Sequence, residues 1–330
     1  MKAESPLRLG SRRSPMAVAQ SGGVARLITQ RTGRQVEVVG VTTFGDVSRE
    51  NLAQIGGTGV FVSALRDSLL RGEVDFAVHS LKDLPTAAPL GITLGAVPAR
   101  DDPRDALVGR DGAKLADLPA GARIGTGSPR RAAQLALLRS DVTCVPIRGN
   151  AGTRLAKVSD GELDAVVLAY AGLVRIGQTD LVTEIFEPED MIPLPGQGAL
   201  AVECRADDTE LIELLATIDH AATHAAVTAE RSLLAALEAG CSAPVGGYAA
   251  FSGTRLRLDA IVLGTAAAPQ APQQPGLDVT AASGTMVIRE RGEADAPDAA
   301  RLGRELAARM LALGAADLMG ANSDRDDAHE

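Results

Sequence analysis

Short runs of Val, Ile and Leu alternate with amphipathic stretches through the first two hundred residues. Runs of this length, bounded by Gly, Pro or polar residues, are typical of buried strands, and the stretches between them have helical spacing. Strands are expected at 7–10, 36–41, 74–79, 92–97, 123–125, 143–147, 165–169 and 199–203. The alternation predicts an α/β fold built on doubly wound parallel sheets.

Two pairs of similar segments indicate an internal repeat. LRLGSRRSPMAVAQ near the start resembles ARIGTGSPRRAAQ from Ala122, and GEVDFAVHS from Gly72 resembles GELDAVVLA from Gly161. We therefore expect two α/β domains of the same plan. The second copy has no counterpart of residues 42–63, a polar, glycine-rich segment that is predicted to form a lid loop.

The hydrophobic pattern changes near residue 218, where an alanine-rich helix is expected at 221–237. Alternating strands at 248–251, 256–262 and 285–289 and a closing helix at 300–318 predict a smaller C-terminal α+β domain. The expected domains are 1–100 (completed by about 197–218), 101–196 and 219–330, with a low-complexity loop at about 265–276 and a disordered tail at about 321–330.

Composition and charge exclude several classes of protein. The formal charge of −9 and the absence of Trp disfavour nucleic-acid binding. No apolar run approaches the ~20 residues of a membrane span and no apolar signal segment opens the chain, so a cytoplasmic protein without membrane contact is expected. The three cysteines, Cys144, Cys204 and Cys241, form no CxxC pair, so neither a disulfide framework nor a metal site is expected.

Two Ser-Pro helix starts carry the first candidate chemistry. Ser14 and Ser128 are suited to cap helices that begin with proline, and the free N–H groups of such a helix start favour an anion. Arginine pairs lie beside both, at 12–13 and at 130–131. A capped helix with solvated arginines is the alternative for either segment alone, but the repetition favours two sites for carboxylate or phosphate.

Further candidates lie where strands end. Lys82 and Asp83 follow an apolar strand at its carboxyl end, where α/β sheets bind ligands, although Asp83 alone would also suit a turn. Arg148 and Arg154 flank a Gly-Asn turn between a strand and a helix. Cys241 lies in a loop of small residues, where a lone cysteine is ordinarily structural.

Seven motifs occur in a fixed order over most of residues 7–250. They are GSRRSPMA, HSLKDLPT, GSPRRAAQL, IRGNAGTRLAK, AGLVR, PGQGALAVECR and AGCSAPVG. In this order they closely resemble the hydroxymethylbilane synthase family, also called the porphobilinogen deaminase family.

The resemblance implies a fold and an activity. The implied fold has two periplasmic-binding-protein-like domains around a cleft and a third domain that presents Cys241. The implied activity is that of a transferase in haem-type tetrapyrrole biosynthesis, which condenses four porphobilinogen molecules head to tail on a dipyrromethane cofactor and releases hydroxymethylbilane by hydrolysis. The cofactor is implied to be a covalent thioether at Cys241. The family's usual state implies a monomer that hands its product transiently to the next enzyme of the pathway.

The resemblance also assigns roles position by position. Asp83 is similar to the catalytic carboxylate, which acts at the pyrrole nitrogens. The positions that match cofactor-binding residues are Cys241, Lys82, Asp83, Ser128, Arg130 and Arg131. The positions that match substrate-binding residues are Arg12, Ser14, Gln20, Arg148, Arg154, Arg175 and Gln197. The chain departs from the family at Thr58 and Ser63, where many members have lysine, and at Gly127, where a second serine is common.

The implied chemistry explains these residue types. Positive charge develops on the pyrrole nitrogens as ammonia leaves, so we expect Asp83 to be a buried carboxylate within hydrogen-bond reach of them. Each pyrrole brings two carboxylates into an acidic protein, and local arginines are needed to compensate them.

Two rival functions come from other classes. A non-catalytic protein that binds small anions would suit the same two-domain fold. A nucleotide-dependent transferase would need a GxxxxGK[ST] or GxGxxG motif, and the chain has neither. The residues leave open which of Arg12 and Arg13 faces the cleft, how ordered the lid is, and the oligomeric state.

Overall fold

The computed structural model describes residues 5–41, 59–87, 89–239, 243–265, 277–280 and 285–320. Cys241, most of the expected lid and nearly all of the expected 265–276 loop lie outside these residues, as does the 321–330 tail. The chain forms two compact units, the first made of Met1–Asp101 and Gly198–His224, the second of Asp102–Gln197 and Ala225–Glu330.

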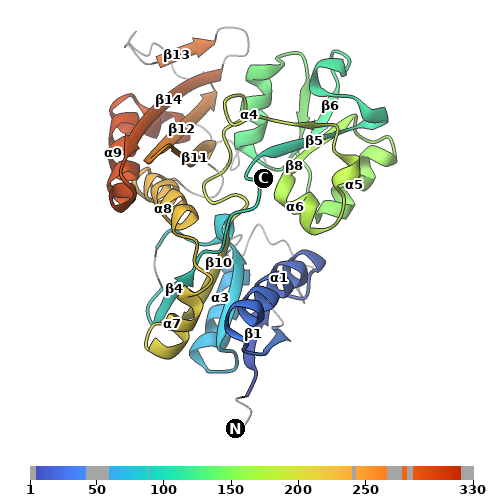
Figure 1. The fold of residues 1–330 in the computed structure, drawn as a ribbon. Coiled ribbons are helices and arrows are strands. Elements are labelled where there is room, and N and C mark those ends of the chain that lie inside the picture. The colour runs from blue at the N-terminus through green and yellow to red at the C-terminus, as the bar shows by residue number, and fades with distance from the viewer. Residues whose placement is uncertain are drawn as a thin grey trace. The chain divides into compact units, whose positions relative to one another are not determined.

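The first unit contains a five-stranded sheet covered by helices (Figure 1). Its strands, in spatial order, are β2 (Val36–Gly40), β1 (Leu7–Ser11), β3 (Phe76–Ser80), β10 (Leu200–Arg205) and β4 (Ile92–Ala96). Its helices are α1 (Pro15–Thr32), α3 (Gly59–Leu70) and α7 (Thr209–Ala216). Apolar residues of α1 and α7 pack with Leu9, Phe76 and Val202, whereas α3 packs Leu65 and Leu69 into a separate cluster. Helices thus bury both faces of the sheet.

The second unit contains a sheet with the same arrangement. Its order is β7 (Thr143–Val145), β6 (Arg123–Gly125), β8 (Ala165–Ala169), β5 (Asp105–Gly109) and β9 (Glu184–Ile185). Its helices are α4 (Pro129–Leu138), α5 (Ala151–Ser159) and α6 (Tyr170–Arg175). In both sheets the first three strands in space are parallel, and the fourth is antiparallel to both of its neighbours. The internal repeat therefore corresponds to a shared topology.

Two expectations for these sheets were wrong. The sheets are mixed rather than parallel, because β10 in one and β5 in the other run against their neighbours. A buried strand has the same apolar pattern in either direction, so the sequence could not show this. The strand β5 was also missed, since it is short and begins with a charged residue, Asp105.

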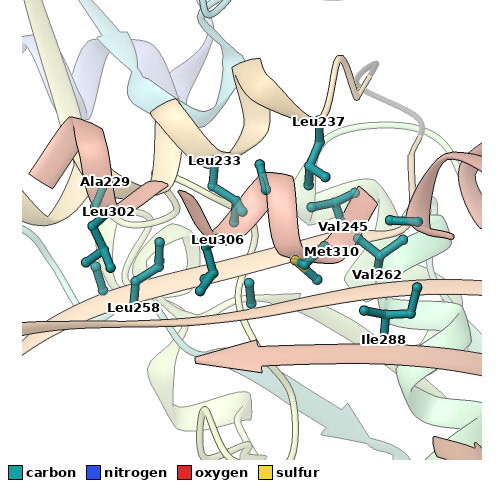
Figure 2. Packing of buried hydrophobic residues seen from close by; sticks show 14 of the residues in the cluster. Ala229, Leu233, Leu237, Val245, Leu258, Val262, Ile288, Leu302, Leu306 and Met310 are labelled. Carbon is teal, nitrogen blue, oxygen red and sulfur yellow. The ribbon is translucent and has the colours of Figure 1, made fainter. Parts of the chain in front are cut away.

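A third sheet, antiparallel and four-stranded, belongs to the second unit. Its order is β11 (Val245–Ser252), β12 (Arg255–Thr265), β14 (Thr285–Ala294) and β13 (Leu277–Thr280). Helices α8 (Ala221–Ala236) and α9 (Ala299–Ala312) pack on one face, where Leu233, Leu258 and Leu306 share a core (Figure 2). A Cβ on Gly303 would come within 2.3 Å of the Ala229 carbonyl oxygen, so the backbones of α8 and α9 approach closely there.

The closing helix expected at 300–318 is two helices. It breaks at Gly314, whose φ is +94°, and α10 (Ala315–Gly320) follows. An achiral residue adopts this left-handed conformation without strain, and the helix ends there. Helix α4 packs against the other face of the third sheet, where Ile192, Ile261 and Val287 form a small core. The division of the chain into three domains with a boundary near 219 stays a prediction.

Among the described helices, none combines the length and apolar character that a membrane span requires.

Candidate active site

A cavity of about 150 Å³ lies in the first unit, at the carboxyl ends of β1 and β3. Its polar lining consists of Arg12, Ser14, Gln20, His79, Ser80 and Asp83. Ser14 caps α1 as expected, since its Oγ accepts a hydrogen bond from the Ala17 N–H at 3.3 Å. The start of an eighteen-residue helix thus faces the cavity with its positive end.

The side chains of Arg12 and Arg13 lie in different surroundings. Arg12 lines the cavity, whereas Arg13 lies against Gly40 at the end of β2, where an added Cβ would be 3.2 Å from the Arg13 Nε. In the first unit, Arg12 is therefore the member of the pair that can meet a ligand.

Asp83 ends one turn of 3-10 helix, η1 (Leu81–Asp83), which also carries Lys82. Leu81 is fully buried, and its N–H donates to the Ala199 carbonyl at 3.0 Å, which fixes the turn to the chain that leads into β10. Asp83 was expected to be buried, but it is exposed at the edge of the cavity. Gln20 lines the same cavity, and its Nε2 donates a 2.8 Å hydrogen bond to Ser80 Oγ.

A buried ion cluster that the sequence did not reveal supports this cavity. Arg66 on α3 donates to both oxygens of Glu203 on β10, at 2.9 and 2.7 Å, and His79 Nε2 lies 3.3 Å from Glu203 Oε2. Burial works to raise the pKa of Glu203, but His79 and Arg66 outweigh it and lower the pKa to about 2. Glu203 is therefore ionised at neutral pH and ties α3 to the sheet beneath the cavity.

Arg130 and Arg131 meet at one carboxylate in the second unit. Arg130 donates to Asp105 Oδ2 at 2.6 Å and to the Ile192 carbonyl at 2.6 Å, while Arg131 Nε donates to Asp105 Oδ1 at 2.9 Å. Burial works to raise the pKa of Asp105, but the two guanidinium charges hold it well below its usual range. Ser128 caps α4, accepting from the Arg131 N–H at 3.4 Å.

Both arginines are buried. Arg130 is only 1% exposed, so in this structure its guanidinium is surrounded by protein. Its assignment as a cofactor ligand stays a prediction. Arg131 is 7% exposed, and it also donates to the Val167 carbonyl at 3.2 Å and to the Gln197 Oε1 at 3.3 Å.

Gln197 completes the network around Asp105. Its Nε2 donates to Asp105 Oδ1 at 2.8 Å and to the Pro103 carbonyl at 2.7 Å. Asp105 follows the charged segment 100–104 and is the first residue of the apolar strand β5, so no local pattern in the sequence marks it as buried.

The remaining arginines lie on other elements of the second unit. Arg154 is on α5, and its Nε donates to the Gly149 carbonyl at 2.8 Å. Burial lowers the pKa of Arg154, and the charge of Arg131 lowers it further. Two neighbouring guanidiniums favour an anion between them. Arg148 is exposed just before α5, and Arg175 ends α6 half-buried.

Gly127, where the family often has serine, faces a close neighbour. A Cβ at this position would lie 2.7 Å from the Ile147 carbonyl oxygen. A side chain here would force the backbone to shift, so the glycine belongs to this local packing.

Cys144 and Cys204 are poorly suited to carry a ligand. Burial raises the pKa of both thiols, that of Cys204 to about 11 with a contribution from the charge of Asp208. Because the thiolate is the reactive form, both are weak nucleophiles. Cys241 lies outside the described residues, between α8 and β11.

Fold and site together define an α/β protein with arginine-lined, capped helix starts suited to ligands that carry carboxylates. Residues 7–213 match the family model described as porphobilinogen deaminase, dipyromethane cofactor binding domain, and residues 224–269 match the model of the porphobilinogen deaminase C-terminal domain. The chain therefore belongs to the porphobilinogen deaminase family. This membership confirms the expected transferase function in tetrapyrrole biosynthesis, hydroxymethylbilane synthesis, and the dipyrromethane cofactor.

Curated relatives are similar over nearly the whole chain. The porphobilinogen deaminase of Thermobifida fusca is 59% identical over 313 residues, which cover 94% of this chain and 95% of that protein. Porphobilinogen deaminase 1 of Streptomyces coelicolor is 58% identical, covering 96% of this chain and 98% of that protein. Among solved structures, an ancestral cationic amino acid solute-binding protein has a TM-score of 0.40 at 17% identity, covering 64% of this chain and 86% of that one.

Proposed function

We propose that this chain extends a dipyrromethane held by the sulfur of Cys241, adding four porphobilinogen molecules in turn and then releasing hydroxymethylbilane. The observation that carries the proposal is the cavity of the first unit, which is lined by the carboxylate Asp83 together with Arg12, Ser14 and Gln20. A pyrrole with acidic side chains needs this combination, a carboxylate for its N–H and cationic or N–H donors for its acids.

Asp83 acts as the catalytic carboxylate. As porphobilinogen loses ammonia, positive charge spreads onto the ring nitrogen, and Asp83 stabilises it and accepts the pyrrole hydrogen bond. Its exposure at the cavity edge lets substrate reach it, and bound substrate would exclude the water around it. Lys82, beside it on η1, pairs with an acidic side chain of the cofactor.

The arginines hold acidic side chains. Arg131 and Arg154, with Ser128 at the start of α4, favour carboxylates in the second unit, and the mutual effect of the two guanidiniums fits a group that brings several negative charges. When bound, the dipyrromethane would supply the free pyrrole α-carbon to which the first porphobilinogen is joined, and each later unit would join the free α-carbon of the ring added before it. Further acidic groups of substrate and growing chain meet Arg148, Arg175 and Gln197.

The same proposal includes a location and an assembly state. The enzyme works in the cytoplasm as a monomer on its small-molecule substrate, and it passes its product transiently to the next enzyme of the pathway. Size-exclusion chromatography with light scattering tests the monomer, because a dimer would elute with twice the chain mass.

Intact-mass spectrometry tests the attachment. The purified protein should be heavier than its chain by one dipyrromethane, and Cys241→Ser should abolish the addition while Cys144→Ser leaves it unchanged. Brief exposure to porphobilinogen should then produce a ladder of one to several added pyrroles. An unmodified protein that binds porphobilinogen without releasing ammonia would instead indicate the anion-binding alternative.

A further inference from the structure

Helix α8 carries a carboxylate in the middle of its apolar face. The buried positions of this helix include Ala226, which belongs to the core of the third sheet. Figure 2 shows Ala229 and Leu233 of the same helix in this core. Glu230 falls among them and is 0% exposed. A carboxylate at such a position is costly unless it is hydrogen-bonded, so its partners indicate why it is there.

Glu230 joins two segments that are distant in sequence. Its Oε2 accepts a hydrogen bond from the Gly196 N–H at 2.7 Å, and its Oε1 accepts one from the Ala249 N–H at 2.8 Å. Ala249 lies in β11, and Gly196 lies in the turn before Gln197. Gly196 has a φ of +77°, in the left-handed region that glycine adopts without strain. A residue with a side chain would be strained in this conformation.

The turn leads directly into the arginine network. Gln197 follows Gly196, and its side chain donates to Asp105 at 2.8 Å and accepts from Arg131 at 3.3 Å. A buried polar path therefore runs from α8 through the turn to the guanidinium of Arg131, and every contact along it lies in the second unit.

The two elements that Glu230 holds also flank the cysteine. Helix α8 ends at Ala236, a few residues before Cys241, and β11 begins at Val245, a few residues after it. One carboxylate thus ties α8 and β11 to the turn that precedes Gln197. A network of this kind sets relative position more than it adds stability.

We propose that Glu230 is a positioning residue, which holds the turn at Gly196 against α8 and β11 so that Gln197 keeps Arg131 in the place where it meets an acidic side chain of the attached cofactor. The inference rests on the proposed attachment at Cys241. Glu230 itself touches no substrate; it acts through Gln197 and Asp105.

The test uses Glu230→Gln in the full-length chain, with Ile288→Val as the matched control. Gln has the same shape, but its amide can accept only one of the two N–H groups. Ile288 lies in the same core, and its side chain has no polar group. Three readouts are compared: the melting temperature, the fraction of protein that carries dipyrromethane by intact mass, and the distribution of added pyrroles after brief exposure to porphobilinogen.

We expect Glu230→Gln to lower the dipyrromethane-carrying fraction at least threefold, or to make the ladder stall at an early step, relative to Ile288→Val at matched melting temperature. Glu230→Asp, which keeps both acceptors on a shorter arm, should recover part of the loss. A carrying fraction and ladder equal to those of Ile288→Val would overturn the proposal.

A second variant covers the case in which Glu230→Gln does not fold. Gln197→Met removes the next link of the path while keeping its volume, and it should produce the same defect; normal attachment and elongation in this variant would also overturn the proposal. If the wild-type protein itself carried no dipyrromethane, the proposed attachment would fail and the result would be separate from that of the variants.

Discussion

The charge of Arg131 adds to burial in lowering the pKa of Arg154, so the two guanidiniums act on each other across the start of α5. Arg131 already forms an ion pair with Asp105, whereas Arg154 donates a hydrogen bond to the Gly149 backbone carbonyl. The pair is therefore arranged to gain from a bound anion.

Replacing Arg154 with Gln should separate binding from stability. Without bound anion, the loss of like-charge repulsion should raise the free energy of unfolding by about 0.5 kcal/mol. Elongation should slow about tenfold or more, because one charge-assisted contact to a carboxylate is lost. Chemical denaturation and timed ammonia release measure the two effects. Arg123→Gln, at an exposed position at the start of β6, is the control and should leave ammonia release unchanged.

Asp105→Asn should destabilise the second unit strongly. The variant leaves the fully buried guanidinium of Arg130 without its charge partner, which costs about 3–5 kcal/mol in comparable buried pairs. Urea denaturation followed by circular dichroism measures this loss. A change below about 1 kcal/mol would contradict the view that Asp105 compensates both arginines.

Asp83→Asn should remove activity without affecting stability. The side chain is exposed at the cavity edge, so the amide should change the melting temperature little. The charge that stabilises the ring nitrogen is lost, and ammonia release should fall by about 10²–10³. Asp180→Asn, an exposed carboxylate outside the cavity lining, provides the comparison. Equal activity in the two variants would remove Asp83 from the catalytic role.

The Glu203 cluster predicts an acid-sensitive contribution to stability. The pKa of Glu203 is lowered from 4.5 to about 2 in the folded protein, so its contribution is fully present above about pH 4.5 and is lost as the pH falls toward 2. A shift of this size corresponds to about 3 kcal/mol. Denaturation midpoints measured from pH 6 to pH 2.5 should fall less steeply in Glu203→Gln than in the wild type. Parallel pH dependences in the two proteins would contradict the assignment.

Local signals in the sequence were enough to find the helix starts of both sites. Ser14 and Ser128 cap their helices as expected, because a Ser-Pro pair carries its own conformational preference. Most strands were placed within two residues, since each is a short apolar run between breakers.

The buried carboxylates could not be found in the same way. Asp105, Glu203 and Glu230 make their contacts with residues far along the chain, and no local pattern reports such partners. The antiparallel direction of β5 and β10 could not be predicted for the same reason, because it is defined relative to strands that are distant in sequence. The exposure of Asp83 likewise depends on the surrounding tertiary structure.

The order of strands in the two related sheets has a consequence for synthesis on the ribosome. All five strands of the second sheet lie between Asp105 and Ile185, whereas the first sheet needs β10, Leu200–Arg205, inserted between β3 and β4. The N-terminal sheet therefore stays incomplete, with the edges of β3 and β4 unpaired, until β10 in the later half of the chain has been synthesised. The portion translated first is the portion that finishes folding later.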